Sequence, residues 1–187
     1  MIKIERRPII GVMGSHEDEW EEYSRPVGEL IAKHDYHLLT GAGAGVMMAT
    51  ARAFCEQEDR LGLSIGIIPT MDYAQGLIAS EEFPNPYIEI PVITQLDQKA
   101  QSDSMPYSRN NVNVMTSHAL VILPGEHGTR NEVALALKYK KPMVLFGPEK
   151  EFELFPEMPT RVEEIGQVQE FLEHTMAQIE IKESITI

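Results

Sequence analysis

Short apolar runs alternate with longer amphipathic segments along most of the chain. Most runs are almost continuously apolar, which is typical of strands that are covered on both faces. Most of them also end in Gly, Pro, Ser or Thr, residues that favour turns. The runs that we expect to form strands are Pro8–Ser15, Tyr36–Gly41, Leu63–Pro69, Tyr87–Thr94, Ala119–Gly125 and Pro142–Gly147.

The segments between these runs carry apolar residues at helical spacing. The expected helices are Glu17–Lys33, Val46–Glu58, Ser104–Ser117, Arg130–Lys140 and Gln167–Ile181. Pro26 is expected to kink the first helix or to break it into two pieces. Because strands and helices alternate, the sequence predicts an α/β fold with a doubly wound sheet of mainly parallel strands, flanked by helices.

The length of the chain favours one domain. Its 187 residues, 43% of them hydrophobic, are enough for one sizeable core and too few for two. A single domain over residues 1–187 is therefore expected. Two segments, Thr70–Pro86 and Gln95–Asn111, are long for connections between strands and helices. Such excursions form lids or subunit contacts, and the choice between these two roles stays open.

Charge and composition exclude several classes of partner. The formal net charge of −13 repels nucleic acid and anionic membranes. No stretch reaches the roughly 18 apolar residues of a membrane span, and the charged segment Met1–Arg7 is unlike a signal peptide. We expect a cytoplasmic protein without a nucleic-acid or membrane partner. His34 and His37 have no further ligands at metal spacing, so no metal site is expected.

In an open parallel sheet, ligands bind beyond the carboxyl ends of the strands, and three turns there are candidates. The first contains Gly14 and Ser15, and the acidic residues Glu17, Asp18 and Glu19 follow it. These carboxylates would repel a phosphate. The first turn is therefore expected to contact a neutral part of the ligand, or to contribute only Ser15.

The second turn has glycines at alternate positions, Gly41, Gly43 and Gly45, followed by Val46. Such glycines permit positive φ and a close approach of the backbone, and free N–H groups at the next helix start attract anions. Val46 stands where the dinucleotide fingerprint would require glycine. The alternative is a tight turn that binds nothing.

The third turn follows the strand that Pro124 ends. Gly125 and Gly128 are expected to turn the chain, and Thr129 to cap the next helix and offer its hydroxyl and N–H groups to an anion. His127 lies inside this turn and is expected to contact the ligand.

Glu132 has two interpretations. It lies three residues after Thr129, so it can close a capping box with that residue. Alternatively it is a carboxylate at the mouth of an anion site, able to act on a sugar carbon or its hydroxyl groups.

The residues of the third turn resemble those of a known family. Pro124-Gly125-x-x-Gly128-Thr129-x-x-Glu132 is similar to the P-G-G-x-G-T-x-x-E signature of the LOG ("Lonely guy") family. Arg109 lies fifteen residues before Pro124, the spacing at which that family carries its site arginine. The second glycine turn, with Met47, resembles the family's other glycine turn. The resemblance extends from about Ile9 to Gly147.

The resemblance implies a Rossmann-like fold and a homo-oligomer, a homodimer or homotetramer. Enzymes of the family hydrolyse the N-glycosidic bond of nucleoside 5′-monophosphates and release ribose 5-phosphate. By the same resemblance, Arg109 and Glu132 would be the catalytic pair, and Gly125, Gly128 and Thr129 would bind phosphate.

Two departures from the LOG pattern change this expectation. Glu126 replaces the second glycine of P-G-G, and Asn110 follows Arg109 where LOG enzymes usually carry lysine. Arg-Asn, together with Asn85-Pro86-Tyr87 and Thr94, more closely resembles the branch that includes molybdenum cofactor carrier proteins. Those proteins bind the pterin phosphate cofactor and do not turn it over.

Three functions therefore remain open: a carrier with molybdenum cofactor as cargo, a phosphoribohydrolase, and a nucleotide-sensing module. Each needs a small phosphorylated ligand and no bound metal. The expected ligand contacts are Gly14, Ser15, Gly41, Gly43, Gly45, Val46, Pro124, Gly125, Glu126, His127, Gly128 and Thr129.

Overall fold

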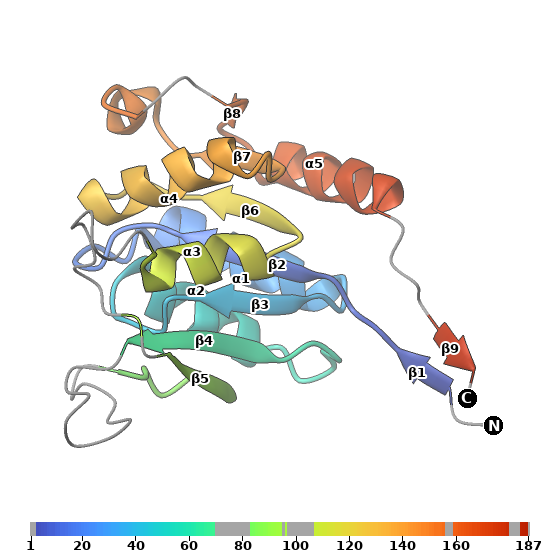
Figure 1. Ribbon diagram of the computed structural model, residues 1–187. Coiled ribbons are helices and arrows are strands. Elements are labelled where there is room, and N and C mark those ends of the chain that lie inside the picture. Colours follow the sequence, from blue (N-terminus) through green and yellow to red (C-terminus); the bar gives the residue numbers. More distant parts are fainter. Residues whose placement is uncertain are drawn as a thin grey trace, which may run out of the picture.

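The protein folds around a seven-stranded parallel sheet (Figure 1). The computed structural model describes residues 3–69, 83–94, 96, 107–155, 159–179 and 184–186. Across the sheet the strands are β5 (Ile90–Thr94), β4 (Ser64–Pro69), β3 (His37–Thr40), β2 (Ile9–Met13), β6 (Ala119–Ile122), β7 (Met143–Phe146) and β8 (Arg161–Val162). Every neighbouring pair is parallel.

The strand order reverses beside β2. From β2 the chain steps outward through β3 and β4 to β5, and then returns to place β6 on the other side of β2. The connecting helices are α1 (Glu21–Lys33), α2 (Val46–Cys55), α3 (Arg109–Thr116), α4 (His127–Lys138) and α5 (Ile165–Gln178). Such a reversal opens a crevice at the carboxyl ends of the two central strands, β2 and β6.

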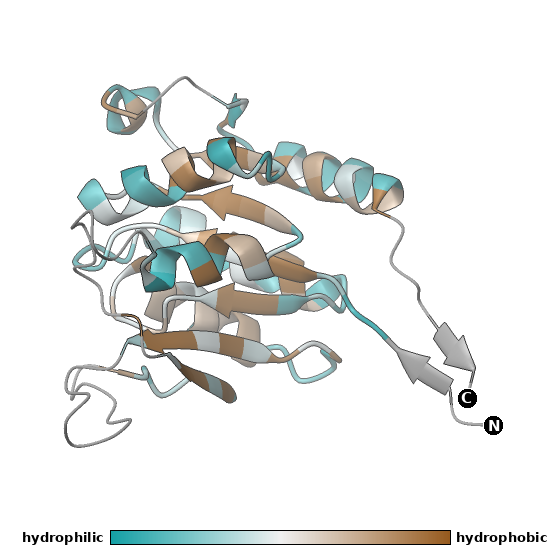
Figure 2. Ribbon diagram, viewed as in Figure 1, coloured by the Kyte–Doolittle hydropathy of each residue, from teal (hydrophilic) through white to brown (hydrophobic). Residues whose placement is uncertain are grey.

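Helices cover both faces of the sheet. On one face α1, α2 and α5 pack against Ile10, Val121 and Val144, whereas on the other α3 and α4 pack against Leu120 and Ile122. Successive strand residues point to opposite faces, so a strand covered on both sides is apolar at every position. The central strands are accordingly brown along their length in Figure 2, which explains the continuous apolar runs.

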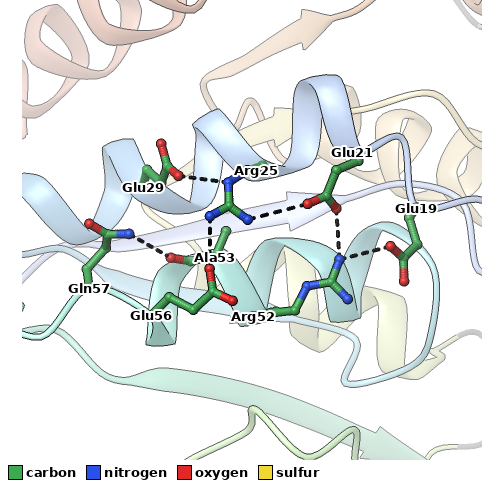
Figure 3. Close-up of polar contacts among 8 residues, drawn as sticks. All are labelled: Glu19, Glu21, Arg25, Glu29, Arg52, Ala53, Glu56 and Gln57. Carbon is green, nitrogen blue, oxygen red and sulfur yellow. Dashed lines mark hydrogen bonds and ion pairs between the residues drawn. The ribbon is translucent and has the colours of Figure 1, made fainter.

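Ion pairs join α1 to α2 along their exposed seam (Figure 3). The Nη2 atom of Arg52 lies 2.9 Å from Glu19 Oε2 and 2.8 Å from Glu21 Oε2. Arg25 Nη2 lies 3.0 Å from Oε2 of Glu56, the residue that follows the last turn of α2. Glu19 and Glu21 are thus paired with arginines at this seam and do not line the cavity described below.

All six expected strands are confirmed, each inside its predicted range. The expected helices also form, but their starts differ: α1 begins at Glu21, and α4 begins at His127 rather than Arg130. Pro26 lies inside α1 without breaking it, so the prediction of two pieces is wrong.

Some short elements were not expected from the sequence. They are β8, the 3₁₀ helix Glu149–Phe152, and an antiparallel pair of β1 (Lys3–Glu5) with β9 (Ser184–Thr186). Strands of two or three residues are too short to show a hydrophobic period. The β1–β9 pair joins opposite ends of the chain (Figure 1), and local patterns carry no signal for such pairing.

Most of the two long excursions lies outside the described residues: positions 70–82, 95 and 97–106. Their expected role as lids or subunit contacts stays a prediction, as does the single-domain organisation. Within the described part of the chain, no helix has the length and apolar character needed to cross a membrane.

Candidate functional site

A cavity of about 310 Å³ lies at the carboxyl ends of the central strands, where the strand order reverses. Turns after β2, β3 and β6 contribute to it, together with the starts of α3 and α4. Its lining consists of Met13, Gly14, His16, Gly41, Met47, Arg109, Asn110, Glu126, His127, Gly128, Thr129 and Glu132.

The start of α4 supplies hydrogen-bond donors to this cavity. The first backbone bond of the helix runs from the N–H of Arg130 to the carbonyl oxygen of Glu126, 3.0 Å away. The N–H groups of His127, Gly128 and Thr129 precede it and have no acceptor inside the helix. A Cβ atom on Gly128 would meet no other part of the protein within 4 Å, so the space beside this first turn is open. Such a helix start attracts anions.

Thr129 and Glu132 do not form the capping box that their spacing allows. Glu126 is the N-cap residue of α4, and Thr129 is the third helical residue. Glu132 is buried, and its Oε1 atom accepts a hydrogen bond from Asn113 Nδ2 at 3.0 Å. The capping interpretation is therefore wrong. Gly128 is also inside the helix and does not turn the chain.

Arg109 joins the start of α3 to the ends of two strands. Its Nη1 atom donates to the carbonyl oxygens of Gly41 and Ile67, the latter at 3.2 Å, and its Cζ lies 5.0 Å from the Phe83 ring centroid. A Cβ atom on Gly41 would lie 2.9 Å from Nη1, so glycine makes room for the guanidinium. Burial lowers the pKa of Arg109 and the Glu132 carboxylate opposes this, but a guanidinium stays protonated in proteins.

The pKa of Glu132 is unusually high for a carboxyl group. Burial raises its pKa from 4.5 to about 7, although the hydrogen bond from Asn113 and the charge of Arg109 both lower it. Desolvation penalises the charged form of a carboxyl group and here outweighs both favourable contacts. Near neutral pH, Glu132 therefore populates both protonation states and is able to give or take a proton.

The backbone of Ser15 ties the three turns together. Its N–H donates to the carbonyl oxygen of Pro124 at 2.9 Å, and its own carbonyl accepts from the N–H of Val46 at 3.0 Å. Gly45 has φ of +59°, and a Cβ atom there would lie 2.4 Å from the Ser15 carbonyl oxygen. The N–H of Val46, an expected anion donor, is thus already bonded to protein.

The side chain of Ser15 orients Glu126. Ser15 Oγ donates to Glu126 Oε1 at 2.9 Å and accepts from the N–H groups of Glu17 and Asp18, each at 3.1 Å. Glu126 itself is exposed and lines the cavity. The residue that replaces the second glycine of the LOG signature therefore adds a carboxylate to the cavity wall.

The structure brings many of the predicted site residues to one cavity. Its lining includes the proposed pair Arg109 and Glu132, and the predicted contacts Gly14, Gly41, Glu126, His127, Gly128 and Thr129. The predicted contacts that do not line it are Ser15, Gly43, Gly45, Val46, Pro124 and Gly125. Contact between any of these residues and a ligand stays a prediction.

Sequence reasoning did not assign Met13, Met47 or Asn110 to this lining, and it missed Asn113 altogether. A signal for Asn113 exists. It lies four residues after Arg109 on α3, the spacing that places two side chains on the same face of a helix. Among the described residues, no group of three or more His, Cys, Asp or Glu side chains could hold a metal ion.

The doubly wound parallel sheet with this cavity at its strand reversal defines a Rossmann-like protein of the LOG-like superfamily, as the sequence resemblance implied. Within that class the chain belongs to the SLOG cluster4 family, whose model matches residues 7–177.

Relatives of known sequence or structure are similar to the chain over most of its length. An uncharacterized protein of Archaeoglobus fulgidus is 31% identical over 141 residues, which cover 74% of this chain and 80% of that protein. The molybdenum cofactor binding protein of Rippkaea orientalis superposes with a TM-score of 0.70 at 29% identity, over 91% of this chain and 98% of its own. The molybdenum cofactor carrier protein of Chlamydomonas reinhardtii superposes with a TM-score of 0.68 at 30% identity, over 92% and 99%.

Proposed function

We propose that this protein is a carrier that binds molybdenum cofactor as cargo in the cavity at the start of α4. The observation that carries the proposal is the helix start formed by His127, Gly128 and Thr129: their N–H groups precede the first backbone bond of α4, and all three residues line that cavity. A phosphate group binds well to such a row because each N–H donates to an anionic oxygen. The two structural neighbours named for that cofactor support the choice of cargo.

The rest of the cavity also suits a pterin phosphate. Its volume of about 310 Å³ is at the lower end of the range of small-molecule sites. Met13 and Met47 offer polarizable side chains to a flat ring, and Arg109 adds a positive charge. These local features attract an anion to a chain whose net charge is −13.

The first test is native mass spectrometry of the freshly purified protein, with released small molecules identified. A co-purifying molybdopterin species, or its oxidised fluorescent product, supports the carrier function. Protein that stays empty after incubation with cofactor released from a molybdoenzyme contradicts it.

The position of the cargo is tested by Gly128→Val, with Gly166→Val as its matched control. Both glycines are exposed second residues of helices, and a Cβ atom on either meets nothing within 4 Å. Gly128→Val fills the space before the free N–H groups, so we expect cofactor affinity to fall at least about tenfold, the equivalent of one weakened charged hydrogen bond. Equal affinity in the two variants would place the phosphate elsewhere.

A second function is favoured by the chemistry of Glu132. A carboxyl group with a pKa of about 7 beside a buried arginine suits cleavage of an N-glycoside, where charge develops on the ribose and the base must leave. This candidate predicts release of ribose 5-phosphate from nucleoside 5′-monophosphates, and its loss in Glu132→Gln. No release from any of the common nucleotides by the unaltered protein excludes it.

By the resemblance to the LOG family we also propose a homodimer or homotetramer in the cytoplasm, without nucleic-acid or membrane partners. Sedimentation equilibrium measures the mass directly, and a monomer over the micromolar range contradicts this assembly.

A further inference from the structure

Asn113 carries a buried polar atom that the hydrogen bonds described so far do not explain. The residue is 1% exposed, and its Nδ2 atom donates to Glu132 Oε1 at 3.0 Å. Its Oδ1 atom is buried and has no hydrogen-bond partner within the described part of the chain. Buried polar atoms are almost always satisfied. The unpaired Oδ1 atom of Asn113, next to the Glu132 carboxyl group, therefore calls for an explanation.

The chemistry of the two groups supplies a reason. An ionised carboxylate only accepts hydrogen bonds, whereas a protonated carboxyl group also has one O–H to donate. The amide of Asn113 offers a donor and an acceptor, and a half-turn of its terminal torsion exchanges them. It can therefore donate to the Glu132 carboxylate or accept from the Glu132 acid. An apolar residue of similar size would satisfy neither form.

We propose that Asn113 is the positioning residue of the site: its amide holds the Glu132 carboxyl group in both protonation states, so that the site takes up a proton when an anionic ligand binds. The inference rests on the proposed function only for the anionic character of the ligand. Burial already raises the pKa of Glu132 to about 7, which makes the exchange accessible near neutral pH. An anion in the same cavity favours the neutral form further.

The other charged groups of the cavity act on the same equilibrium. Arg109, from α3, favours the Glu132 carboxylate. Glu126, at the start of α4, lines the same cavity, and a negative charge there would favour the acid. His16 and His127 are the other titratable side chains that line the cavity. The effect of Glu132 must therefore be separated from theirs.

The experiment follows the Glu132 carboxyl group itself. Protein labelled with ¹³C at the glutamate side-chain carboxyl carbon is titrated by NMR from about pH 5 to 9, the range in which histidine and the shifted carboxyl group titrate. The Glu132 signal is identified by its absence in Glu132→Gln. Sulfate is the anionic probe because its charge is constant over this range, and chloride keeps the ionic strength matched.

The proposal predicts a Glu132 midpoint near 7, moved upward by saturating sulfate. Asn113→Leu removes the donor to the carboxylate and the acceptor for the acid. Because a hydrogen bond to the charged form is the stronger of the two, the midpoint should rise by about one pH unit, and Asn113→Gln should restore part of this shift. His16→Gln and His127→Gln should each retain the shift caused by sulfate. If Asn113→Leu does not fold, Asn113→Met, which also lacks the donor and adapts its flexible apolar side chain to the site, is expected to raise the midpoint in the same way.

Two results would overturn the proposal: a midpoint that is the same with and without the Asn113 amide, or one that sulfate leaves unchanged. Both measurements use no molybdenum cofactor. Failure of the protein to bind that cofactor therefore contradicts the carrier function alone. A Glu132 midpoint that does not change contradicts only the role of Asn113.

Discussion

Glu126 and Glu132 bring negative charge into a cavity whose backbone attracts anions. Glu126 is held near the start of α4 by the Ser15 hydroxyl, and Glu132 is buried beside Arg109. We expect Glu126 to weaken ligand binding and Glu132 to lower the stability of the fold at high pH. A single substitution at each position measures the effect.

Neutralising Glu126 should strengthen anion binding. Glu126→Gln removes a charge from the cavity wall but leaves an oxygen to accept from Ser15 Oγ. We expect sulfate affinity to rise roughly threefold to tenfold at low ionic strength, and less at high salt, as for unit charges separated by several ångströms near a surface. Isothermal titration calorimetry checks this. Glu170→Gln, an exposed position on α5, changes the net charge equally and should have no comparable effect.

Glu132→Gln should stabilise the fold at alkaline pH. Because its pKa rises from 4.5 to about 7 on folding, the folded state holds this proton more tightly than the unfolded state. The contribution to stability is complete below pH 4.5 and is lost as the pH rises through about 7. The loss amounts to about 3 kcal/mol.

Urea unfolding at several pH values checks this prediction. The variant should gain about 3 kcal/mol at pH 8, where the wild-type carboxylate is charged, and almost nothing at about pH 4.5. An equal gain at both pH values would mean that the side chain is destabilising for a reason other than its charge.

At the scale of elements, α1 and α2 lie in close contact because Gly28 has no side chain. A Cβ atom at position 28 would lie 2.5 Å from the Thr50 carbonyl oxygen and 3.0 Å from the Phe54 backbone nitrogen. Backbone atoms cannot move aside as a side chain can. The surface ion pairs of Figure 3 add little to this contact, since exposed pairs contribute weakly.

Gly28→Ala should therefore destabilise the protein, although alanine favours helices by about 1 kcal/mol over glycine. We expect a net loss of about 1–3 kcal/mol, the usual cost of overpacking. Gly166→Ala, where the added methyl group meets nothing within 4 Å, should be neutral or slightly stabilising. Denaturant unfolding of both variants measures the difference, and equal stability would show that α1 shifts away from α2 without cost.

At the scale of the whole molecule, one sheet serves both hydrophobic layers. Val121 contributes to the layer beneath α1, α2 and α5, and its neighbours Leu120 and Ile122 contribute to the layer beneath α3 and α4. Neither layer can be lost without exposing strands that also form the other. This shared sheet is the physical basis for proposing a single domain.

Unfolding should then be one cooperative transition. Trp20 is the only tryptophan and lies at the N-cap of α1, so its fluorescence reports one layer, whereas far-ultraviolet circular dichroism reports every helix. We expect the two urea curves to coincide at a fixed protein concentration. Two separated midpoints would indicate independently unfolding parts.

The site could be predicted only in part. Arg109 and the residues from Glu126 to Thr129 reach the cavity from positions that the glycine turns and the family resemblance indicate. The role of Glu132 was ambiguous because its spacing from Thr129 also fits a capping box. Burial beside Asn113 resolves this ambiguity, since a capping side chain would have to point back to the helix start.

The sequence by itself determined the order and kind of the main elements, because strands buried on both faces must be apolar throughout and the helices between them amphipathic. It also determined which turns are rich in glycine. Only the tertiary structure decided which residues of the turns reach the cavity: the N–H of Val46 at the start of α2 donates to the Ser15 carbonyl oxygen, whereas His127, Gly128 and Thr129 at the start of α4 line the cavity. That choice, like the acidity of Glu132, depends on contacts between distant segments, and local sequence does not encode these contacts.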